Sequence, residues 1–98
     1  MRQEDFFEQV WALVQEIPCG SVTTYGELAK MLGHPGHSRL VGRAMRYAPE
    51  GLPCHRVVNS AGRCAPHWPQ QPQLLRAEEV PFLKSGRGDL TRCLWQGL

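Results

Sequence analysis

The sequence predicts a small, mostly α-helical domain with a short β-hairpin, arranged around a helix-turn-helix. Apolar residues recur at helical spacing between residues 5 and 16, which predicts a first helix. A capping pattern and a tight turn then predict two short helices over residues 24–32 and 38–47. Further on, a β-branched pair at residues 57–58 precedes a turn-forming stretch, which predicts a hairpin with residues 63–64.

Length and composition limit the chain to a few classes of protein. With 98 residues, 42% of them hydrophobic, it can build one modest core, so a single domain over residues 1–98 is expected. The net charge of +2 is mildly basic, which fits a nucleic-acid partner without requiring one. The absence of a long apolar run, of a secretory signal and of a CxxC pair predicts a cytoplasmic protein with reduced thiols and no membrane partner.

The starts of the first two predicted helices are marked by capping residues. Asp5 is the expected N-cap of the first helix, whose apolar stripe includes Trp11 and so places this side chain in the core. Thr24 and Glu27 form a capping box for the second helix. Tyr25 is then the first helical residue, beside free backbone N–H groups that suit a phosphate.

The third predicted helix has two chemically different faces. At about 100° per residue, Arg39, Arg43 and Arg46 fall on one arc, opposite an apolar arc, and Gly42 lies at the edge of the arginine stripe. Such a face is usually solvated, but here it follows a helix and a turn, as in a helix-turn-helix. Arg39 stands in the first turn, where a cation is unfavourable for the helix dipole, which indicates an outside partner.

A thiol, an imidazole and a guanidinium stand on consecutive residues at Cys54, His55 and Arg56. Pro53 stiffens the chain before them, so Cys54 is expected on a rigid bend that leads into a buried strand. A cysteine reacts as the thiolate and needs a nearby base or positive charge, although most buried cysteines are only apolar filler. Neither His34 with His37 nor Cys64 with His67 has zinc-finger spacing, so no metal or other cofactor is expected.

Three blocks of the sequence resemble a known family in order and spacing. Pro53–Val57 resembles the active-site motif of the O6-alkylguanine-DNA alkyltransferases, and Ile17–Ala29 and Ser38–Arg46 resemble their approach to the helix-turn-helix and their recognition helix. The resemblance extends to the alkyltransferase-like proteins, which usually carry Trp or Ala in place of the cysteine. It implies a winged-helix-like DNA-binding domain that binds the minor groove of a duplex and rotates O6-alkylguanine out of the stack.

The resemblance also implies roles for individual residues. In the catalytic set, Cys54 would take the alkyl group, His55 would take the thiol proton, and Glu78 would orient the histidine; only alignment with the family selects Glu78 over Glu79. For DNA binding, Tyr25 would crowd a phosphate, Arg39 would fill the space left by the flipped base, and the rest of the helix face would contact the duplex through Gly42, Arg43 and Arg46. The lesion pocket would comprise Pro53, Cys54, Arg63 and Trp68, with Trp68 equally interpretable as a loop anchor.

Two functions remain open on this resemblance. The first is single-turnover transfer of the alkyl group to Cys54, as by a methylated-DNA–protein-cysteine methyltransferase, and the retained cysteine favours it slightly. The alternative is a sensor that binds O6-alkylguanine in double-stranded DNA and recruits nucleotide-excision repair proteins. Ala48 stands where the alkyltransferases have a bracing asparagine, which affects the position of Cys54. A plain helix-turn-helix regulator is a third class. The protein is expected to be a monomer.

Overall fold

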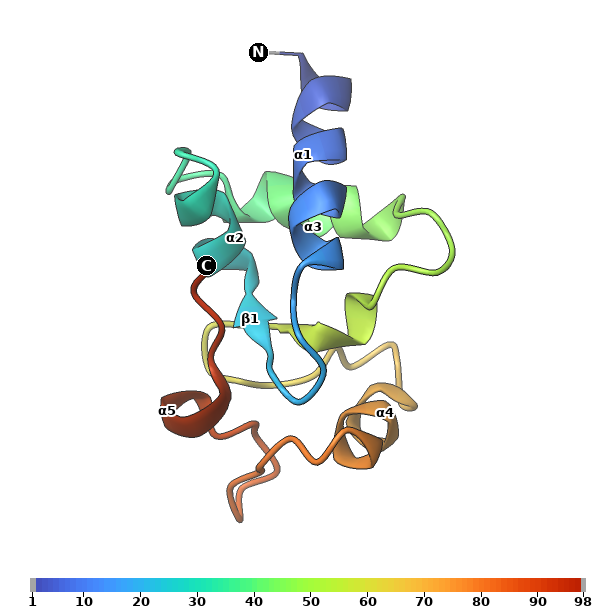
Figure 1. Cartoon of the computed structure of the whole chain (residues 1–98), viewed down its shortest axis with the longest axis vertical. Helices are drawn as coiled ribbons and strands as arrows, with labels where there is room; N and C mark the ends of the chain where they lie inside the picture. The colour runs from blue at the N-terminus through green and yellow to red at the C-terminus, as the bar shows by residue number, and fades with distance from the viewer. Residues whose placement is uncertain (1, 98) are drawn as a thin grey trace.

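In the computed structural model, which describes residues 2–97, helices α1, α2 and α3 gather at one end and α4 and α5 at the other (Figure 1). A two-stranded sheet lies between the two groups. None of these helices is long and apolar enough to cross a membrane. The elements in chain order are α1 (Gln3–Gln15), β1 (Thr23–Thr24), α2 (Tyr25–Met31), α3 (Ser38–Arg46), the 3-10 helix η1 (Cys54–Arg56), β2 (Val57–Val58), α4 (Gln71–Ala77) and α5 (Leu90–Cys93).

The two strands are parallel, so the predicted β-hairpin is wrong. Val57 pairs with Thr23, and the next residue of each strand continues this register. The chain after β2 closes on itself instead: the side-chain oxygen of Asn59 accepts from the N–H groups of Ala61 and Arg63, each at 2.9 Å. This Asx-type turn ends the strand, because the side chain of Asn59 takes N–H groups that a second strand would have offered.

The sheet joins two hydrophobic cores. Successive side chains on a strand point to opposite faces, and Val57 and Val58 accordingly belong to different cores. The larger core packs α1, α2 and α3 together, and the indole Nε1 of half-buried Trp11 donates to the carbonyl of Ala44 at 2.7 Å. The smaller core contains Leu75 of α4, whereas its neighbour Leu74 is 41% exposed.

The helix-turn-helix forms as predicted from α2 and α3. The hydroxyl of Thr24 accepts from the N–H of Glu27 at 3.0 Å, which caps α2 as the sequence pattern indicated. On α3, Val41 and Ala44 are buried against the rest of the domain. The predicted cap of α1 is wrong: the N-cap is Arg2, three residues earlier, and Asp5 lies in the first turn, where a carboxylate favours the helix dipole.

Candidate functional site

Cys54 lies on a short rigid turn between Pro53 and β2. The N–H of Cys54 donates to the carbonyl of Leu52 at 2.8 Å, and the N–H of Arg56 donates to the carbonyl of Pro53 at 3.0 Å. The Arg56 bond and a second one, from the N–H of Val57 to the carbonyl of Cys54, wind residues 54–56 into η1, after which the chain becomes extended at Val57. The turn therefore holds a half-buried thiol directly before a buried strand, as the sequence predicted.

Behind this turn, Glu78 binds two consecutive side chains of the motif. Its carboxylate accepts from His55 Nε2 at 2.7 Å and from Arg56 Nε and Nη2 at 2.9 Å each. The remaining Arg56 nitrogen, Nη1, donates to the carbonyl of Ile17 at 2.8 Å, and the Gly20 N–H lies 3.4 Å from the same carboxylate. The network therefore joins the Cys54 turn to the end of α4 and to the loop before β1.

Arg56 keeps the Glu78 carboxylate of this network ionised. Hydrogen bonds from the Arg56 guanidinium, then from His55 and the Gly20 N–H, lower the pKa of Glu78 to about 2. The same hydrogen bond raises the pKa of Arg56. Glu78 rather than Glu79 faces the imidazole, in agreement with the alignment. Arg56 was not among the predicted site residues, since an arginine following Cys-His carries no local sign that its partner lies 22 residues away.

The surroundings of Cys54 favour the protonated form of its thiol. Burial raises its pKa, so the thiol form predominates at neutral pH. Within residues 2–97, no hydrogen bond joins the Cys54 sulfur to His55, whose Nε2 is engaged by Glu78. Transfer chemistry would therefore need an intermediate proton carrier between the sulfur and the imidazole.

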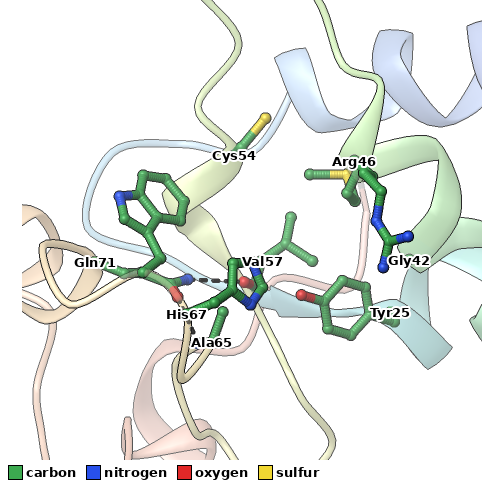
Figure 2. A pocket seen from close by; sticks show the side chains of 10 residues that line it. Tyr25, Gly42, Arg46, Cys54, Val57, Ala65, His67 and Gln71 are labelled. Carbon is green, nitrogen blue, oxygen red and sulfur yellow. Dashed lines mark hydrogen bonds between the residues drawn. The ribbon is translucent and has the colours of Figure 1, made fainter.

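A pocket of about 310 Å³ opens beside the Cys54 sulfur, between α3 and the loop that follows β2 (Figure 2). This volume lies at the lower end of the range of small-molecule sites. Figure 2 shows the side chains of Cys54, Arg46, Tyr25 and His67 around one space. Burial at this position raises the pKa of Tyr25. The lining residues are Tyr25, Gly42, Met45, Arg46, Cys54, Val57, Ala65, His67, Trp68 and Gln71.

The pocket brings together some of the predicted site residues and excludes others. Tyr25, Gly42, Arg46, Cys54 and Trp68 line it, whereas the predicted pocket residues Pro53 and Arg63 do not. The remaining predicted DNA-binding residues lie exposed on α3: Arg39 and Arg43.

Met45, His67 and Gln71 are pocket residues that sequence reasoning missed. Met45 lies between the two arcs of α3, and its position in the pocket follows only from the docking of that helix. Gln71 is buried, with 1% of its surface exposed, although glutamine is usually an exposed residue. No local pattern identifies it, because its partners lie in three other segments of the chain.

Known proteins match the chain over most of its length. The family model "6-O-methylguanine DNA methyltransferase, DNA binding domain" matches residues 5–80. A DNA base-flipping protein of Vibrio parahaemolyticus is 41% identical over an alignment of 98 residues that covers 95% of this chain and 98% of that protein. A methylated-DNA–protein-cysteine methyltransferase of Mycolicibacterium paratuberculosis is 40% identical over 65 residues, which are 64% of this chain and 39% of that protein.

A solved structure has the same fold. It is the crystal structure of S. pombe Atl1 in complex with damaged DNA containing O6-carboxymethylguanine, with a TM-score of 0.88 and 33% sequence identity. The match covers 99% of this chain and 100% of the solved one. Fold, motif order and the extent of these matches agree, and the chain belongs to the family of the 6-O-methylguanine DNA methyltransferase DNA-binding domain.

Proposed function

We propose that this protein binds duplex DNA through α3, rotates an O6-alkylguanine into the pocket beside Cys54 and marks it for nucleotide-excision repair without removing the alkyl group. Two findings support this choice over transfer. The relative named for base flipping matches this chain and is itself matched almost completely, whereas the methyltransferase is matched over 39% of its length. Burial raises the pKa of the Cys54 thiol, and within the described residues 2–97 no hydrogen bond joins its sulfur to His55.

The observation that carries the proposal is the position of the pocket. It lies between the recognition helix α3 and the Cys54 turn, and it has a volume of about 310 Å³. The O6 atom of a paired guanine is inaccessible inside the stack, so a protein that reads this atom must first extrude the base. A pocket next to the DNA-facing helix gives the extruded base a place to bind.

Each DNA-facing residue has a part in this proposal. Tyr25 begins α2 and lines the pocket, where it would press on the phosphate of the rotating nucleotide. Arg39 is exposed in the first turn of α3, where its guanidinium would fill the gap in the stack. Packing inside the protein does not require a glycine at position 42, because no atom lies within 4 Å of a Cβ built there. In this proposal, Gly42 instead lets the helix backbone approach the duplex. Arg43 is exposed for phosphate contact.

Alkyl transfer is the second candidate, and the observation that favours it is that Cys54 lines the pocket. The thiolate would attack the alkyl carbon and form a thioether while the bond to O6 breaks. The thiol proton would pass to His55 through a carrier, and one proton would return through solvent to the departing guanine, so that no proton is gained or lost overall. We expect this step to be slow, because burial raises the pKa of the Cys54 thiol and the thiolate is the reactive form.

Base flipping is tested with a duplex that carries O6-methylguanine opposite a fluorescent base analogue. Binding of the wild type should raise the fluorescence, because the analogue loses its pairing partner and is held less firmly in the stack. Arg39→Ala should bind undamaged duplex with about the affinity of Arg39→Lys but lose most of the lesion preference, about 1–3 kcal/mol, the scale of lost stacking. Full fluorescence and undiminished preference in Arg39→Ala would remove this residue from the flipping step.

A further inference from the structure

Gln71 connects the two sides of the pocket through its side-chain amide. Its Nε2 donates to the carbonyl of His55 at 3.0 Å and to the carbonyl of Val57 at 2.9 Å. Its Oε1 accepts from the N–H of Ala65 at 2.7 Å. Both N–H groups and the oxygen of the amide are thus used, and the amide orientation is fixed because a reversed one would face two carbonyls with an oxygen.

The loop that these bonds hold is the wall of the pocket opposite α3. Residues 65–70 form no helix or strand, and two of them, His67 and Trp68, line the pocket. Two backbone bonds stay inside this segment and its junction with α4: the Trp68 N–H to the Ala65 carbonyl, and the Gln71 N–H to the Trp68 carbonyl, each at 3.1 Å. Within residues 2–97, the hydrogen bonds that tie this wall to the Cys54 turn all pass through the side chain of Gln71.

We infer that Gln71 is a positioning residue that sets the distance between the wall at His67–Trp68 and the Cys54 turn, and so selects which O6 substituents the pocket holds. This inference rests on the proposed function, because it assumes that the pocket binds the extruded base. Gln71 acts through backbone groups on both sides of the pocket. Small adducts depend on close contact with both walls, whereas large adducts fill a loosened pocket better.

Gln71→Met tests the inference, because methionine has a similar length and no hydrogen-bonding group. Affinities for duplexes with guanine, O6-methylguanine and O6-benzylguanine are measured for the wild type, Gln71→Met and Leu75→Val. Leu75 is buried in the same helix outside the pocket, so Leu75→Val controls for lost stability. Gln71→Met should lose at least about tenfold of its preference for O6-methylguanine over guanine, equivalent to about 1.4 kcal/mol. Its preference for O6-benzylguanine over guanine should fall by less, and its affinity for undamaged duplex should stay the same.

Gln71→Glu adds a readout that a general loss of stability would not move. Its ionised carboxylate keeps the acceptor for the Ala65 N–H but opposes the carbonyls of His55 and Val57 with negative charge. Protonation restores one donor, and burial among carbonyls favours the protonated form. The methyl-lesion preference of Gln71→Glu relative to the wild type should therefore be lost at about pH 8 and recover at about pH 5.5. The wild-type reference at each pH accounts for the other titratable pocket groups, Cys54, Tyr25 and His67.

The outcomes separate this inference from the proposed function. A wild type with no preference for either lesion would refute both. A wild type that prefers the lesions, with Gln71→Met showing the same preference and the same order of adducts, would refute only the role of Gln71. Equal losses in Gln71→Met and Leu75→Val would also refute it, because the effect would then follow stability rather than pocket width. A pH-independent Gln71→Glu would contradict the hydrogen-bond account.

Discussion

Glu78 fixes the Cys54 turn to the rest of the domain, and Glu78→Gln measures how strongly. The carboxylate accepts from two nitrogens of Arg56 at 2.9 Å each and from His55 at 2.7 Å. Glutamine keeps one oxygen but turns an NH₂ group toward donors that the second oxygen had bound. Charge-assisted hydrogen bonds contribute about 1.5–3 kcal/mol each, so the free energy of unfolding should fall by about 2–3 kcal/mol at pH 7.

The pKa of Glu78 gives this effect a definite pH dependence. Arg56 above all, then His55 and the Gly20 N–H, hold that pKa at about 2, against an ordinary value of 4.5. A carboxylate whose pKa is depressed by folding stabilises the fold above its unfolded-state pKa and loses that contribution as the pH falls. The stability difference between wild type and Glu78→Gln should therefore be complete above about pH 5 and shrink toward pH 2.

Urea denaturation followed by tryptophan fluorescence, in steps from about pH 7 to about pH 2.5, measures both quantities. Glu79→Gln is the matched control, because it removes the same charge from the adjacent exposed residue, which has no ion pair within residues 2–97. Equal destabilisation of the two variants at neutral pH would refute the reasoning. So would a difference between them that does not shrink as the pH falls from about 5 to about 2.5.

Three further variants test other parts of the account. Arg43→Ala should weaken binding to damaged and undamaged duplex equally and lower the slope of log K against log salt by about one, because one phosphate contact is lost. This slope is measured by a salt titration followed by fluorescence anisotropy, and an unchanged slope would show that Arg43 does not contact the DNA. Trp11→Phe should cost about 1 kcal/mol in urea denaturation, since it deletes the bond to Ala44; no change would contradict a contribution from that bond. Gly62→Ala should cost at least about 2 kcal/mol, because Gly62 has φ +83° and an added Cβ would lie 2.6 Å from the Gly88 oxygen; a fully stable variant would contradict this geometry.

The parts of the fold that local sequence determines were predictable. Thr24 caps α2 because the hydroxyl and its N–H partner lie three residues apart, and such a pair is visible in the sequence. The two faces of α3 follow from helical periodicity in the same way. The Cys54 turn was also expected, since Pro53 and the two valines constrain it from both sides.

The long-range partners were not predictable from local patterns. Two adjacent valines favour a strand but do not say whether its partner precedes or follows it, so the parallel pairing of Val57 with Thr23 was missed. The roles of Arg56 and Gln71 were missed for the same reason, because their side chains bind groups between 6 and 39 residues away. The sequence therefore indicated the residues around Cys54 but not the hydrogen bonds that hold them there.

The most direct test of the central claim is the intact-protein mass after hours with excess O6-methylguanine duplex. We expect the wild type to bind this duplex more tightly than undamaged DNA and to gain no mass, because burial raises the pKa of the Cys54 thiol and no hydrogen bond within residues 2–97 joins its sulfur to His55. Cys54→Ser should likewise gain no mass. A gain of one methyl group, mapped to Cys54 and absent in Cys54→Ser, would show alkyl transfer and contradict the claim that the protein only recognises the lesion.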